Sequence, residues 1–172
     1  MATINGSTSS SNWTFKLETV EGTPDIVNNN SPLTVKVFVG RSSSESYMDG
    51  GKMSCVIDVT GCANKTISYD NTGKKIDVAA GGWWEMGSAT FTVPHDANGK
   101  KTVTVSASFT YSYSPNSASA SGKVTLTDIV RLIHIKLNGV WKDGIVWVKT
   151  GGVWKRGLAW IKKSGVWKRG GA

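Results

Sequence analysis

The sequence holds two cysteines in 172 residues, which is too few for a fold stapled by disulfides. It contains no apolar stretch near the roughly 20 residues that a membrane-spanning helix needs, so we expect no membrane insertion. Its first residues carry neither the basic segment nor the apolar segment of a secretory signal. We therefore expect the protein to be synthesised in a cytoplasm without a signal peptide.

The residues that most often carry catalysis or bind metals are also scarce. The sequence has two histidines, His95 in an expected turn and His134 in a repeated segment, and neither has cysteines at metal-ligand spacing. A Cys–His nucleophile would have to use Cys55 or Cys62, and no local motif supports one. A glycine-rich phosphate loop is missing as well. We therefore predict a protein without enzymatic activity, bound metal or cofactor.

The charge is distributed unevenly along the chain. Residues 1–130 carry ten Lys or Arg against eleven acids, whereas residues 131–172 carry ten against one, which is Asp143. Five of the eight tryptophans lie in the second segment, which has two Ser or Thr against 35 in the first. A change of composition this large predicts two structural units, 1–130 and 131–172.

The first unit shows the period-two alternation of half-buried strands. Alternating apolar residues occupy 13–17, 33–39, 55–59, 89–93, 103–111 and 124–126, with shorter candidates at 65–69 and 74–78. Clusters of Asn, Asp and Gly separate these segments and predict tight turns. Seven or eight short strands at this spacing predict an immunoglobulin-like antiparallel β-sandwich. Cys55 and Cys62 are too close in sequence to pin opposite sheets, and whether they pair stays open.

The second unit is a threefold repeat of thirteen residues. The copies are 132–144, 145–157 and 158–170; the last two share eight identical positions and the first two share six, where chance gives about one. Each copy places a glycine-containing turn between two short apolar segments, and so many glycines would destabilise a helix. The repeat predicts three short β-hairpins.

Hairpins of this size are too small to bury a core of their own. Their tryptophans each bury about 200 Å² when covered, so they need a partner surface. That surface is the β-sandwich, another copy of the chain or another protein. We favour oligomer assembly or anchoring through five residues: Trp141, Trp147, Trp154, Trp160 and Trp167.

A second hypothesis is carbohydrate binding at Trp83, Trp84 and Glu85, which follow a glycine pair. Neighbours on a strand face opposite ways, so one tryptophan should be in the core and the other outside. An exposed tryptophan could stack on a sugar ring while Glu85 accepts hydrogen bonds from hydroxyls. The alternative, which we favour, is that both pack, one in the core and one under a loop or a neighbouring subunit.

The mixture of Lys, Arg and Trp in 131–172 is also typical of single-stranded nucleic-acid surfaces. However, the tryptophans recur at a fixed spacing set by glycine turns, as in structural repeats, and no recognition motif accompanies them. Nucleic-acid binding is therefore a minor alternative. An anionic cell-wall polymer or an acidic capsid or tail surface is another partner that the basic segment would suit.

Four segments carry a family resemblance: 31–44 (SPLTVKVFVGRSSS), 81–83 (GGW), 90–106 (TFTVPHDANGKKTVTVS) and 114–122 (SPNSASASG). They resemble a module of siphophage tail and minor structural proteins, from phages of Gram-positive bacteria. The Gly-Val-Trp-Lys repeats resemble C-terminal repeats at the ends of phage tail and fibre proteins. Together these resemblances cover most of the chain.

The resemblance implies a virion component with an Ig-like domain, without enzymatic activity and without catalytic or binding residues to transfer. The implied partners are further copies of the chain and other virion proteins, with host cell-surface polysaccharide as the target if the protein also adheres to the host. The module usually recurs in tandem within long proteins, whereas here it occurs once. Tail, fibre and capsid decoration therefore all stay open as its place in the virion.

Overall fold

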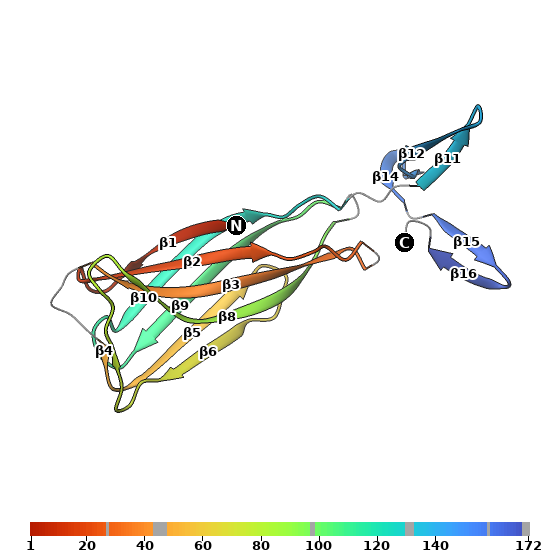
Figure 1. The fold of residues 1–172 in the computed structure, drawn as a ribbon. Helices are drawn as coiled ribbons and strands as arrows, with labels where there is room; N and C mark the ends of the chain where they lie inside the picture. The colour runs from red at the N-terminus through yellow and green to blue at the C-terminus, as the bar shows by residue number, and fades with distance from the viewer. Residues whose placement is uncertain (27, 43–47, 97–98, 130–132, 158, 170–172) are drawn as a thin grey trace. The chain divides into compact units, whose positions relative to one another are not determined.

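The protein is all-β (Figure 1). Its structure, a computed structural model, describes residues 1–172 except 27, 43–47, 97–98, 130–132, 158 and 170–172. Eight strands form one antiparallel sheet in the order β6-β5-β9-β10-β1-β2-β3-β8. Their bounds are β1 Ala2–Thr8, β2 Trp13–Glu21, β3 Asn30–Arg41, β5 Lys52–Val59, β6 Lys65–Asp70, β8 Trp83–Pro94, β9 Thr102–Tyr111 and β10 Ser117–Thr125. The predicted β-sandwich is confirmed.

A short ladder of β4 (Met48–Asp49) with β7 (Lys75–Ile76) accompanies this sheet. The segment 74–78, predicted as a strand, is thus reduced to two paired residues. Strand β1 was not predicted, and β8 and β10 begin earlier than their alternating segments. Strand β1 and the added part of β10 consist mostly of small or polar residues, which give little hydrophobic signal, whereas the added part of β8, Trp83 to Ser88, lacks a strict alternation of apolar and polar residues.

Strand β1 belongs to both layers of the sandwich. Its residues Ala2 to Asn5 pair with β2, and its residues Gly6 to Thr8 pair with β10. The change of partner falls at Gly6, where any side chain would overlap the carbonyl oxygen of Ser119. Glycine therefore allows β1 to pass close to β10 at the point where the sheet bends.

The core is built by the inward-facing rows of both layers. Phe15 on β2 and Phe109 on β9 meet with ring centroids 5.9 Å apart, so side chains from the two layers interdigitate. The predicted alternation is confirmed along β2, β3, β5 and β9, whose inward residues are buried. The largest fully buried side chains are Phe15, Phe91, Phe109, Leu17, Leu33, Met48, Met53, Ile57, Val35, Val37, Val39 and Val59.

The two end strands of the sheet, β6 and β8, are joined by side chains. The ring of Tyr69 meets that of Trp84 edge-on at 4.9 Å. Further along, the Lys65 ammonium donates a hydrogen bond to the Thr90 carbonyl oxygen at 2.6 Å. We call this contact line, from Tyr69–Trp84 to Lys65–Thr90, the seam. It brings the ends of the sheet together while the described ladders leave β6 and β8 unpaired with each other.

The C-terminal repeats fold as three hairpins. They are β11 (Ile133–Leu137) with β12 (Val140–Gly144), β13 (Trp147–Thr150) with β14 (Val153–Arg156), and β15 (Trp160–Lys163) with β16 (Val166–Arg169). Each turn has two residues, both with positive φ: Asn138–Gly139, Gly151–Gly152 and Ser164–Gly165. Paired positive φ angles define the type I′ turn, whose twist matches a two-stranded ribbon. The predicted hairpin repeat is confirmed.

The chain divides into two compact units. One comprises residues 1–22, 32–93 and 102–125, and the other comprises 23–31, 94–101 and 126–172. The boundary predicted near residue 130 falls on 130–132, outside the described residues.

Candidate functional site

The repeats place one lysine opposite one tryptophan in every hairpin. In the ladder register the pairs are Lys136–Trp141, Lys149–Trp154 and Lys162–Trp167. Each Nζ lies 5.9 Å from the centroid of its partner ring. This distance is within the range of cation–π attraction, which contributes about 0.5–1 kcal/mol at exposed sites. The repeat thus reproduces one side-chain arrangement three times.

The other two tryptophans share the face of these pairs. Trp147 precedes Lys149 by two residues and Trp160 precedes Lys162 by two, and alternate residues of a strand point the same way. In the first repeat this position belongs to His134, whose side chain lies outside the described part of the chain. All five tryptophans are between 48% and 65% exposed. We call this side of the hairpins the tryptophan face.

The opposite face of each hairpin, which we call the aliphatic face, carries aliphatic side chains together with lysines such as Lys142 and Lys155. Val140, Val153 and Val166, which follow the turns, alternate with the tryptophans and are 58–60% exposed. Every described side chain of the six hairpin strands is exposed. The hairpins therefore hold an unusual amount of apolar surface in water on both of their faces.

The structure separates the three residues predicted as a carbohydrate site. On β8, Trp83 and Glu85 are exposed, and the Glu85 carboxylate accepts from the Lys36 ammonium at 3.1 Å. Trp84 is half-buried and packs on Tyr69 in the seam. Trp83 and Glu85 therefore share one surface, and Trp84 lies elsewhere.

Sequence reasoning missed the surroundings of His95. Its Nε2 lies 2.9 Å from the Ser31 hydroxyl oxygen, and its Nδ1 lies 2.9 Å from the Gly99 carbonyl oxygen. A carbonyl oxygen only accepts hydrogen bonds, so Nδ1 carries a proton, and in the neutral ring Nε2 then accepts from the Ser31 hydroxyl. Ser31 is fully buried. This serine–histidine pair is therefore shielded from solvent and joins the start of β3 to the segment after β8, and its separation of 64 residues gives no local sequence signal.

We expect His95→Ala to lower the free energy of unfolding by about 3 kcal/mol, because the buried Ser31 hydroxyl loses its partner and a cavity forms. Urea unfolding of His95→Ala, Ser31→Ala and the double variant measures this effect. The sum of the losses in the two single variants should exceed the loss in the double variant, because each single variant removes the same hydrogen bond. Strict additivity would contradict a stabilising Ser31–His95 bond.

The two cysteines occupy different environments. Burial raises the pKa of the Cys55 thiol to about 12, so this thiol is protonated at neutral pH. The Cys62 amide donates to the Val59 carbonyl, which holds Cys62 beside the end of β5. Val59 follows Cys55 by four residues along β5, a span of about 13 Å, whereas a disulfide needs Cα atoms within about 7 Å. Pairing of these cysteines would therefore disrupt β5.

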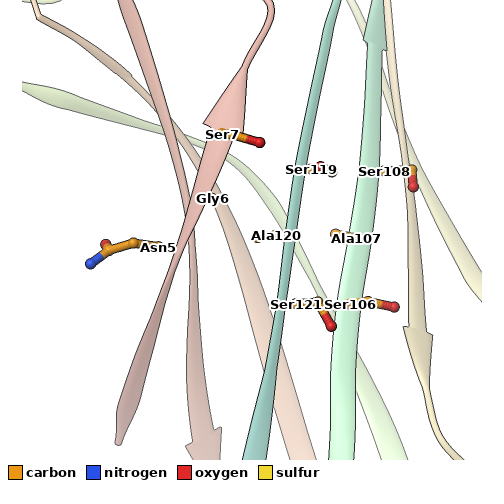
Figure 2. Close-up of a pocket in the computed structure, with 9 residues that line it drawn as sticks. All are labelled: Asn5, Gly6, Ser7, Ser106, Ala107, Ser108, Ser119, Ala120 and Ser121. Carbon is orange, nitrogen blue, oxygen red and sulfur yellow. The ribbon is translucent and has the colours of Figure 1, made fainter.

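A depression of about 430 Å³ lies on β1, β9 and β10 (Figure 2). It is lined by residues 5–7, 106–108 and 119–121, which are Asn, Gly, Ala and Ser. The lining offers small polar groups and contains neither an aromatic nor a charged side chain. It includes none of the predicted site residues.

Among the described residues, His, Cys, Asp and Glu form no group of three that could hold a metal ion. The same part of the chain has no helix long and apolar enough to cross a membrane. No protein-family model and no curated protein matches this sequence.

Proposed function

We propose that this protein is a non-enzymatic structural component of a bacteriophage virion, located in the tail, a fibre or a capsid decoration. Its three C-terminal hairpins hold copies together as a homo-oligomer or anchor them to other virion proteins. The virion assignment is supported by the resemblance to siphophage tail proteins. The assembly role is supported by the hairpins themselves.

The observation that carries the assembly role is the exposure of five tryptophans on the tryptophan face of two-stranded hairpins. Covering apolar surface contributes about 2.5 kcal/mol per 100 Å². Aromatic residues are also the side chains that most often dominate the energetics of interfaces. A partner surface would therefore gain much from covering these hairpins.

The charge of the repeats limits how copies can meet. Residues 131–172 carry ten basic residues and one acid, so two hairpins meeting directly would bring like charges together. Each lysine of the three Lys–Trp pairs lies over a ring, where the aromatic quadrupole offsets part of its charge. We therefore expect contacts through the rings, and assembly that strengthens as salt screens the repulsion.

The test is the solution mass of the full chain and of a chain ending at residue 130, measured by light scattering. All buried hydrophobic residues of the described chain lie at or before Ile129, so the shorter chain keeps its core. We expect a discrete oligomer for the full chain and a folded monomer for the shorter one. If both chains are monomers, self-assembly is contradicted. If both chains are oligomers, the interface lies on the sandwich.

A further inference from the structure

The outer surface of β2, β3 and β8 carries an aromatic ring laid across the sheet. Trp83 on β8 lies against Gly40 of β3, where a Cβ atom would come within 2.6 Å of ring carbon Cε3. The Lys16 ammonium of β2 lies 4.5 Å from the centroid of the same ring. Gly40 thus makes room for the indole next to the backbone, and Lys16 holds it by a cation–π contact.

The lysine is buried more deeply than the indole. The side chain of Lys16 is 16% exposed, although lysine is normally among the most exposed residues. Trp83 remains 40% exposed. The Lys16 ammonium is also 4.9 Å from the ring centroid of Phe38, its partner in the ladder. The lysine is therefore largely buried against aromatic rings, whereas a substantial part of the indole faces solvent.

Polar groups of both signs surround the ring. Glu18 lies opposite Lys36 in the ladder and accepts from Lys16 at 2.7 Å, while Glu85 accepts from Lys36 at 3.1 Å. The four charges cancel, so this surface favours neither an anionic nor a cationic ligand. Each carboxylate can accept additional hydrogen bonds, and each ammonium has three donors.

We propose that this surface binds a neutral glycan, and we call it the Trp83 platform: Trp83, Glu85, Lys36, Lys16 and Glu18. The apolar face of one sugar ring stacks on the indole, and the sugar hydroxyls donate to Glu85 and accept from Lys36. A neutral sugar suits the platform because it offers an apolar face, donors and acceptors without net charge. Trp84 takes no part, because it packs against Tyr69 in the seam.

This inference is independent of assembly, because the Trp83 platform lies on the large sheet and the tryptophan face lies on the hairpins. The two surfaces also differ in charge. The hairpins belong to a segment with a large excess of Lys and Arg, whereas the platform is balanced. Raised salt should therefore weaken polyanion binding to the hairpins and leave glycan binding at the platform nearly unchanged.

The test uses the full chain on an array of short neutral hexose and N-acetylhexosamine oligosaccharides, followed by calorimetry with the strongest binder. Trp83→Ala should weaken binding by about tenfold or more, because an aromatic anchor is lost. Trp83→Phe should retain part of the affinity. Glu85→Gln should weaken binding without removing the ring. Trp154→Ala, which removes an exposed tryptophan from a hairpin, is the matched control and should bind normally.

Three results would overturn the proposal: no neutral oligosaccharide binds, Trp83→Ala binds as well as the original chain, or Trp154→Ala loses the binding. Binding restricted to sulfated glycans or single-stranded DNA, and abolished by salt, would also overturn it and point to the basic segment. The solution mass of Trp83→Ala should equal that of the original chain. A change in the solution mass of Trp83→Ala would show that Trp83 takes part in self-association, and the glycan proposal is judged by the binding measurements.

Discussion

Replacing Trp141, Trp154 and Trp167 together by alanine is expected to abolish self-association of the full chain. Truncating a central interface tryptophan costs about 2 kcal/mol or more, and each of these three rings is at least 61% exposed and so available to a partner. Three such losses correspond to roughly four orders of magnitude in Kd. Sedimentation equilibrium over a range of concentrations measures the change.

The aliphatic face provides the matched control for this experiment. Val140, Val153 and Val166 are similarly exposed, on the opposite face of the same hairpins. Replacing all three by threonine keeps the β-branched shape that suits a strand. If the tryptophan face forms the interface, the threonine variant should assemble nearly normally. If instead the threonine variant dissociates while the alanine variant still assembles, the interface lies on the aliphatic face.

Phe109→Ala is expected to destabilise the β-sandwich by about 3–5 kcal/mol, which is a large part of a domain's stability. Phe109 is 1% exposed and its ring meets Phe15 of the other layer, so alanine leaves a cavity where the layers interlock. Chemical denaturation followed by the near-ultraviolet circular dichroism signal measures the loss.

Phe38→Ala is the control, since Phe38 lies on the outer surface of β3 beside Lys16. The same change of side chain should cost about 1 kcal/mol or less there. Equal effects at the two positions would contradict the assignment of Phe109 to the core and Phe38 to the surface.

The fold class and the hairpins could be predicted because both depend on short-range patterns. Inward residues such as Leu17, Val37 and Ile57 are large and alternate strictly, so the period of two is visible in the sequence. The hairpin turns need two successive positive φ angles, which Asn138–Gly139 and Gly151–Gly152 supply at little steric cost. Local chemistry therefore determined these elements.

The remaining features depend on residues that are distant in sequence. Strand β1 has one buried hydrophobic side chain, Ile4, so its pairing with β2 and β10 leaves almost no alternation to detect. The Ser31–His95 bond joins two residues that are 64 positions apart in the sequence. Trp83 and Trp84 were expected to face opposite ways because they are neighbours on a strand. Which of them is half-buried depends on the contact of β6 with β8, where Tyr69 packs on Trp84.

The division of β1 between two partners affects how the domain unfolds. Because Ala2 to Asn5 belong to one layer and Gly6 to Thr8 to the other, separating the layers breaks hydrogen bonds of a single continuous strand. Melting of either layer therefore releases part of a strand that continues into the other layer. The strand thereby couples the two halves into one cooperative unit, and heat should remove them in a single transition.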